Sequence, residues 1–285
     1  MRAAAFNDVS TNPQYQALKR SQSLSFGWQL SGAALNSNEV DGLCNTLSDG
    51  KCDKWVEMGL DLASLQGPIC NSTHTHLNAT DAFPKVADAN SQAFSVALMN
   101  AFPANNKAVR SYLCDNLRYK ALDNFFLNAN VIIDATCTAS NTAIHPEPFS
   151  AVGPPPTQAA IDAYQNARSV LYAWEYASQA ESSSQLNQYC AHAPDYQSNW
   201  QALQLNATQV QETLCSFQQP ISAEEGSAAM RQWTSVAFIV ALENISNVNM
   251  WLGWLCSQLD SEGMDSVGLD GSLVKQSVCN DSARN

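Results

Sequence analysis

The stretch WTSVAFIVALENISNVNMWLGWLC, residues 233–256, decides the fold class. If it is helical, Val236, Val240 and Trp251 lie on one face, and Phe238 and Leu252 lie on another. A helix that is apolar on nearly every side is a buried helix. We therefore expect a long buried helix from about residue 222 to 259 in an all-α protein. The alternative is a break near residues 244–249, because the stretch ENISNVN is poor in helix-forming residues.

Helical spacing continues outside this stretch. Thr157 can cap a long helix that carries Tyr164, Val170 and Tyr176 on its apolar positions. Asn12 and Pro13 form a typical helix start. Alternation of β-branched and polar residues, the signal of strands, is rare throughout the chain. The pattern predicts a helical domain of roughly eight to ten helices over residues 1–285.

The segment IHPEPFSAVGPPPT, residues 144–157, interrupts the helical pattern with five prolines. Each proline disfavours helical backbone at the residue before it. We interpret the segment as a crossover within one domain. The alternative is two helical subdomains, residues 1–143 and 158–285. The sequence shows no internal repeat that we can identify.

Composition excludes several classes of partner. The 285 residues are 45% hydrophobic but only 14% charged, with a net charge of −12 and a sequence pI of about 4.6. An acidic surface repels phosphate backbones and anionic lipids, so we expect neither nucleic acid nor an anionic membrane as a partner. The longest apolar run, residues 236–242, is far too short for a membrane span.

Nine cysteines are scattered along the chain and form no C-x-x-C pair. This pattern favours disulfides formed in an oxidising, extracellular compartment over a zinc site. Short connections between antiparallel helices would join cysteines that are neighbours in sequence. We expect four pairs, with Cys70 left over: Cys44–Cys52, Cys114–Cys137, Cys190–Cys215 and Cys256–Cys279.

Sequons for N-glycosylation agree with secretion. We expect glycans at Asn71, Asn78 and Asn206. The sequon at Asn244 lies in the helix that we expect to be buried, where a glycan does not fit. Asn244 should therefore be bare.

The segment CNSTHTHLNAT, residues 70–80, contains two histidines, His74 and His76, one residue apart. On extended backbone both side chains would point to the same side and could bind one metal ion. A stable site needs three or four ligands, and the two flanking sequons indicate a solvent-exposed loop. We expect an exposed loop with at most a weak metal site, and no cofactor.

Glu243 is the candidate acid–base residue. It lies on the helix that we expect to be buried, one turn from Asn247. Burial raises the pKa of a carboxyl group, and such groups are concentrated at functional sites. The structural alternative is an ion pair with Arg168 or Arg110.

Aromatic residues on two helices form the candidate ligand-binding site: Tyr172, Trp174, Trp251 and Trp254. Core packing is the alternative explanation. The sequence lacks the G-x-S-x-G, H-E-x-x-H and phosphate-loop motifs. We expect a secreted, disulfide-rich helical glycoprotein that binds a small apolar molecule or another protein. The alternative is a secreted enzyme that uses Glu243 or a metal held by histidines.

Overall fold

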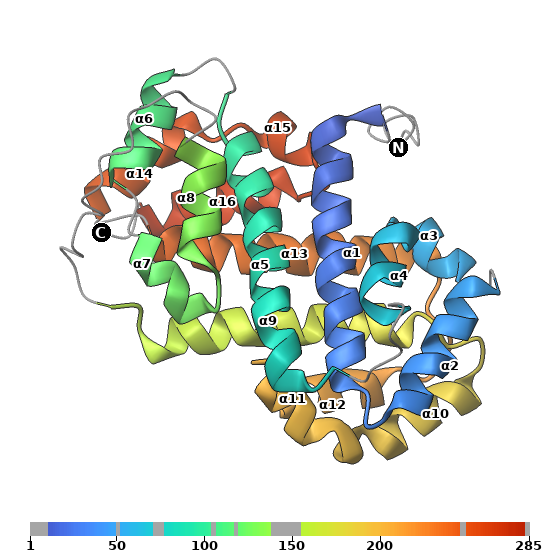
Figure 1. Ribbon diagram of the computed structural model, residues 1–285. Coiled ribbons are helices and arrows are strands. Elements are labelled where there is room, and N and C mark those ends of the chain that lie inside the picture. The colour runs from blue at the N-terminus through green and yellow to red at the C-terminus, as the bar shows by residue number, and fades with distance from the viewer. Residues whose placement is uncertain are drawn as a thin grey trace. The chain divides into compact units, whose positions relative to one another are not determined.

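The computed structural model describes residues 11–49, 52–70, 77–103, 107–116, 119–137, 155–245 and 249–282 (Figure 1). Within these ranges every regular element is a helix, which confirms the all-α prediction. The chain is divided more finely than the eight to ten helices expected. Short helices such as α3 (Asp53–Met58) and α15 (Ser261–Ser266) contain too few residues to show a helical period.

The fold contains one structural repeat that occurs four times in the described residues. Each time, a helix of 20 to 23 residues is followed by shorter helices, two of which are joined by a disulfide. We number the copies repeats 1 to 4: residues 13–70, 79–137, 158–215 and 223–279. This repeat was not identified from the sequence. The long helices are α1 (Pro13–Ala33), α5 (Ala79–Asn100), α9 (Gln158–Ala177) and α13 (Ala223–Ile245).

The short helices complete each repeat. Repeat 1 has α2 (Ser37–Ser48), α3 and α4 (Leu62–Ile69). Repeat 2 has α6 (Lys107–Asn116), α7 (Tyr119–Leu122), η2 (Asp123–Phe125) and α8 (Ala129–Cys137). Repeat 3 has α10 (Ser183–His192), η4 (Ala193–Tyr196), α11 (Gln197–Ala202) and α12 (Ala207–Ser216). Repeat 4 has α14 (Asn249–Gln258), α15 and α16 (Gly271–Ser282).

One disulfide closes each repeat at the same place. It joins the first short helix to the last one or, in repeat 1, to the residue directly after the last one, across sequence separations of 26, 23, 25 and 23 residues. The bonds are Cys44–Cys70, Cys114–Cys137, Cys190–Cys215 and Cys256–Cys279. Three of these are the expected pairs.

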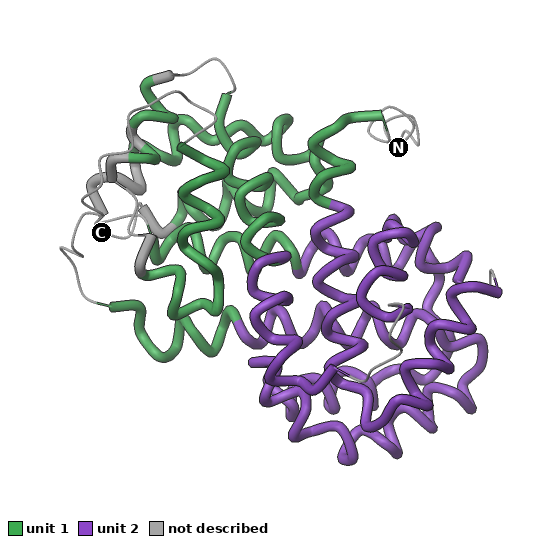
Figure 2. The backbone as a smooth tube through the Cα atoms, in the orientation of Figure 1, with its two compact units in different colours: residues 1–18, 90–164, 234–285 green, residues 19–89, 165–233 purple. Residues whose placement is uncertain are grey.

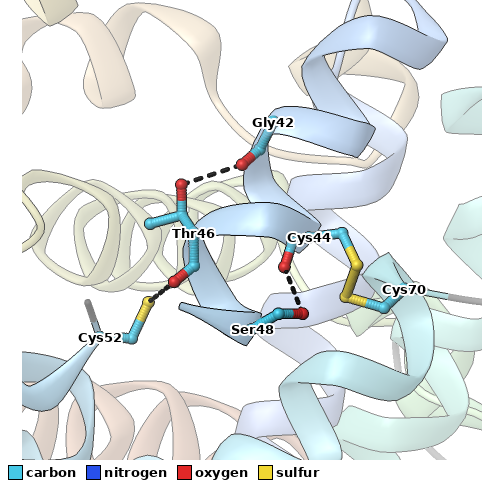
Figure 3. The surroundings of a disulfide bond; sticks show 6 residues. All are labelled: Gly42, Cys44, Thr46, Ser48, Cys52 and Cys70. Carbon is cyan, nitrogen blue, oxygen red and sulfur yellow. Dashed lines mark hydrogen bonds between the residues drawn. A yellow bond between two sulfur atoms is a disulfide. The ribbon is translucent and has the colours of Figure 1, made fainter. Parts of the chain in front are cut away.

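The expected Cys44–Cys52 pair was wrong. Helix α4 packs against α2 and brings Cys70 to a Cα–Cα distance of 5.1 Å from Cys44. Cys52 is the free cysteine and is 1% exposed, with its thiol directed at the carbonyl of Thr46 (Figure 3). The prediction that neighbouring cysteines pair failed only in repeat 1, because Cys52 is an extra cysteine between the two that close the repeat.

A second feature recurs in all four repeats, at the turn before the last helix. The turn contains a residue with positive φ, then a buried leucine, then an aspartate or asparagine whose side chain caps the last helix. The aspartate or asparagine precedes the second disulfide cysteine by nine residues each time. The four turns are Gly59-Leu60-Asp61, Phe126-Leu127-Asn128, Gln204-Leu205-Asn206 and Gly268-Leu269-Asp270.

A buried serine ties each turn to the long helix of its own repeat. The backbone N–H of the capping residue donates to the serine hydroxyl at 2.7 or 2.8 Å. Each of these serines is 0% exposed. The pairs are Ser23 with Asp61, Ser91 with Asn128, Ser169 with Asn206 and Ser235 with Asp270.

The chain forms two compact units, coloured in Figure 2. Unit 1 comprises residues 1–18, 90–164 and 234–285, and unit 2 comprises residues 19–89 and 165–233. The short helices of repeats 1 and 3 therefore belong to unit 2, and those of repeats 2 and 4 to unit 1. Each unit takes residues from both sides of the proline-rich segment, unlike the two subdomains of our alternative. The expectation of a single domain over residues 1–285 stays a prediction.

Equivalent positions pair within each unit. The aromatic residue three positions after the buried serine contacts its counterpart from the other repeat of the same unit. In unit 2, Phe26 lies against Tyr172 with ring centroids 5.9 Å apart. In unit 1, Phe94 lies against Phe238 at 5.3 Å. Each unit thus contains an equivalent pair of rings in contact.

The stretch 222–259 forms α13 and α14 rather than one described helix, and residues 246–248 between them lie outside the described residues. Most of the proline-rich segment also lies outside them. The C-terminal half of α13 is largely buried, as expected, with Ala241 and Leu242 both 0% exposed.

Candidate ligand-binding site

Unit 2 contains a cavity of about 370 Å³. This volume lies at the lower end of the range for small-molecule sites, about 300–1,000 Å³. Helices of both repeats contribute to its wall, and most of the lining comes from repeat 3. The lining residues include Leu30, Glu39, Leu43, Tyr172, Tyr176, Tyr189, His192, Tyr196, Trp200 and Leu214.

Aromatic rings form a continuous wall of this cavity. The rings of Tyr172 and Tyr176 are stacked at a centroid distance of 6.1 Å, and Tyr176 lies 4.7 Å from Tyr189. On the other side of Tyr172, Trp200 lies at 6.2 Å, and Tyr196 stacks on Trp200 at 5.8 Å. A ligand in the cavity would therefore meet ring faces and edges in several orientations.

The lining of the cavity includes both buried and exposed residues. Tyr172 and Trp200 are each 2% exposed, and the indole N–H of Trp200 donates to the Tyr172 hydroxyl at 3.3 Å. Gln188 and His192, in contrast, are exposed. The cavity is thus lined by buried rings and bordered by residues that solvent reaches.

Burial raises the pKa values of all four tyrosines that line the cavity. Further negative groups raise the pKa of Tyr196, chief among them the Glu39 carboxylate. The four phenols are therefore neutral at physiological pH. They can offer ring faces and hydroxyl groups to a ligand, but no phenolate.

Glu39 supplies the carboxylate of this wall. It lies in the first turn of α2, where its Oε2 accepts the backbone N–H of Leu35 at 3.0 Å. The same oxygen accepts the Tyr196 hydroxyl at 3.4 Å. The helix start and the tyrosine both hold the carboxylate beside the aromatic wall. The residues that the structure describes around the cavity include neither lysine nor arginine.

His192 is an exposed residue of the cavity lining. Its Nδ1 is 3.2 Å from the Asp195 carboxylate, and both side chains are well exposed. An exposed pair of this kind contributes little to stability.

Repeat 3 differs from the other repeats at the positions that line the cavity. Tyr172 stands where the other repeats have phenylalanine: Phe26, Phe94 and Phe238. Tyr176 stands where they have leucine: Leu30, Leu98 and Leu242. Tyr189, directly before the first disulfide cysteine, also replaces leucine: Leu43, Leu113 and Leu255. The repeat fold is thus compatible with aliphatic side chains at the last two positions.

The aromatic residues predicted to bind a ligand are only partly brought together. Tyr172 lines the cavity. Trp174 packs against Phe217 instead, with ring centroids 4.8 Å apart. Trp254 belongs to unit 1, and the side chain of Trp251 lies outside the described residues. The binding role of these four residues stays a prediction.

The predicted catalytic and metal-binding residues are not brought together in the described part of the structure. Glu243 is half-buried in α13 rather than enclosed, because the helix turns this position towards its less covered side. Asn247, His74 and His76 lie outside the described residues, as does Asn71. Within the described ranges, no group of three or more histidine, cysteine, aspartate or glutamate side chains could hold a metal ion.

Sequence reasoning missed the carboxyl group that is buried. Glu175 is 3% exposed in α9, and desolvation raises its pKa to about 8, against the opposing effect of the Arg168 guanidinium. The signal was present, because Glu175 is an isolated acid within the apolar run of residues 170–177. Glu175 does not line the cavity, so its burial does not by itself indicate catalysis.

Comparison with known proteins found no matching family model, no matching curated protein and no matching solved structure. Among the described residues, no helix combines the length and hydropathy needed to cross a bilayer. The four disulfides are typical of an extracellular protein. The geometry of the cavity is therefore the basis for a functional assignment.

Proposed function

We propose that this protein is a secreted binding protein that takes up a small, largely apolar molecule in the aromatic cavity of unit 2. The secreted form would carry glycans at exposed sequons. The observation that carries the proposal is the set of three tyrosines of repeat 3 at positions where the other repeats have phenylalanine or leucine.

Packing alone does not account for Tyr176 and Tyr189, whereas Tyr172 is buried and its hydroxyl accepts the Trp200 indole N–H. A tyrosine that fills a core needs a partner for its hydroxyl group, whereas leucine fills the same kind of position without one. Tyr176 and Tyr189 are half-buried around an open cavity rather than enclosed in a core. A ligand that stacks on the rings would account for their presence. Binding pockets are usually concave and apolar, with a few polar groups that orient the ligand.

Binding of small aromatic probes tests the proposal. We expect p-cresol and indole to bind the intact protein, as measured by saturation-transfer NMR titrations. The matched variant replaces Tyr176 and Tyr189 by the residue of the other repeats, Tyr176→Leu with Tyr189→Leu. It should keep the helical circular dichroism spectrum and the four disulfides but bind the probes at least about tenfold more weakly. Probe binding that is unchanged in this folded variant would refute the proposal.

A further inference from the structure

We infer that the cavity of unit 2 selects an organic cation: an amine or quaternary ammonium group attached to an apolar or aromatic body. This inference rests on the proposed function and names the chemistry of its ligand. Three features of the cavity support it: the ring faces, the position of Glu39 and the charges of the lining.

The ring faces are the first feature. The face of an aromatic ring carries partial negative charge and attracts cations that lie within about 6 Å of the ring centroid. Tyr172, Tyr176, Tyr189, Tyr196 and Trp200 form a chain of neighbouring rings with centroid separations between 4.7 and 6.2 Å. A cation among these rings can contact more than one face. Leucine at positions 176 and 189 would keep the cavity apolar but would remove this attraction.

Glu39 is the second feature. Its carboxylate lies next to Tyr196, whose ring stacks on Trp200. The bonds from Leu35 and Tyr196 fix one carboxylate oxygen, Oε2, while Oε1 accepts no hydrogen bond from the described residues. An ammonium group in the cavity could therefore pair with a carboxylate that is already held in place. An anionic ligand would be repelled by the same group.

The charge balance is the third feature. Among the described residues that line the cavity, Glu39 is the acidic one. None of them is a lysine or an arginine that could neutralise its charge. The whole chain carries a net charge of −12, which favours the approach of cations over anions. The neutral phenols add hydroxyl groups without adding positive charge.

Three probes of similar shape but different charge test the inference: 2-phenylethylammonium, 2-phenylethanol and phenylacetate. Isothermal titration calorimetry of the intact protein at pH 7 measures each dissociation constant. We expect the cation to bind about tenfold or more tightly than the neutral alcohol, and the anion to bind most weakly. The same order should persist in competition against p-cresol.

Variants identify the source of the preference. Glu39→Gln keeps an oxygen that can accept the bonds from Leu35 and Tyr196 but removes the charge. It should reduce the affinity for the cation, and with it the preference for the cation over 2-phenylethanol, severalfold. Glu212→Gln, on the exposed face of α12, removes the same charge away from the cavity and should change neither value.

The outcomes separate this inference from the proposed function. If the cation and the alcohol bind equally well, or if Glu39→Gln leaves their ratio unchanged, the inference of a cation site is wrong while the cavity remains a binding site. If none of the three probes binds, and p-cresol and indole also fail, the proposed function itself is wrong.

Discussion

The hydroxyl group of Ser169 accepts the backbone N–H of Asn206 at 2.7 Å, across 37 residues of chain. The same hydroxyl donates to the carbonyl of Gln165, one turn earlier in α9. Ser169 thereby joins the long helix of repeat 3 to the turn that starts its last helix. Three further serines make the equivalent bond, so this contact sets the geometry of every repeat.

Ser169→Ala should lower the free energy of unfolding by about 1–3 kcal/mol, because it leaves the N–H of Asn206 without its acceptor next to a fully buried position. Ser23→Ala should have an effect of similar size through Asp61. Urea denaturation of each variant measures the change.

Ser184→Ala is the matched control. Ser184 is exposed in α10, so its replacement should change the free energy of unfolding by less than about 0.5 kcal/mol. If the buried and exposed serines respond equally, the serine bond does not hold the repeats together.

Gln204→Gly should stabilise the protein. Gln204 has a φ of 59°, in the left-handed region that glycine adopts without strain and that glycine occupies in repeats 1 and 4. The strain of a side chain there, about 1–2 kcal/mol, exceeds the entropic cost of glycine, about 0.5–1 kcal/mol. The expected gain in the free energy of unfolding is up to about 1 kcal/mol by urea denaturation.

The reciprocal variant checks the sign. Gly59 has a φ of 101° at the equivalent position of repeat 1, so Gly59→Ala should be destabilising. If both variants change the free energy of unfolding in the same direction, backbone strain does not determine the effect of substitution at these positions.

The repeat was missed in the sequence for a physical reason. Its recurring positions are a serine, an aromatic ring, a leucine, a capping residue and two cysteines, and the first of these lies 35 to 38 residues before the capping residue. Helix surfaces between these positions tolerate many residues, so overall similarity is low. A search for leucine and aspartate or asparagine, followed nine residues later by cysteine, would have found all four copies.

The sequence predicted which helices are buried, but not which polar residues within them are covered. Apolar periodicity correctly indicated an all-α protein, and it correctly placed Leu242 in the core. It could not distinguish Glu243, which is half-buried, from Glu175, which is buried, because both are single acids in apolar stretches. Which of them is covered depends on tertiary packing. The same limit applies to Trp174, whose neighbour Phe217 is remote in sequence.

The free thiol of Cys52 should react with iodoacetamide only after denaturation. Cys52 is 1% exposed, and burial raises the pKa of its thiol, so little reactive thiolate is accessible in the folded protein. Peptide mapping without reduction should recover Cys44 linked to Cys70. Recovery of Cys44 linked to Cys52 would contradict the finding that one disulfide closes every repeat at the same place.

Glycans should occupy Asn78 and Asn206 when the protein is made in a eukaryotic host, and Asn244 should be bare. Asn78 and Asn206 are exposed residues at helix starts, where one amide hydrogen remains available after the local hydrogen bonds. Asn244 is half-buried within α13, and its amide donates to the Val240 carbonyl at 2.8 Å. Glycopeptide mass spectrometry measures each site. High occupancy at Asn244 would show that this part of α13 is open to solvent.

The buried carboxyl group of Glu175 should make the protein less stable as the pH rises. Below a pH of about 4.5 the group is protonated in both states. Between 4.5 and 8 the unfolded chain loses this proton while the folded protein keeps it, so the free energy of unfolding falls as the pH rises. Above about 8 the loss is complete. For this group alone, the expected slope within the window is about 1.4 kcal/mol per pH unit.

Glu175→Gln isolates this effect, since it removes the titration and keeps the shape. Gln29, 2% exposed at the equivalent position of repeat 1, shows that glutamine fits such a site. Urea denaturation at several pH values should give the variant and the parent similar stability near pH 4.5. The variant should then become progressively more stable than the parent up to pH 8. Glu212→Gln, at an exposed position, should follow the parent at every pH. A constant difference between Glu175→Gln and the parent across the window would mean that Glu175 does not hold its proton in the folded protein.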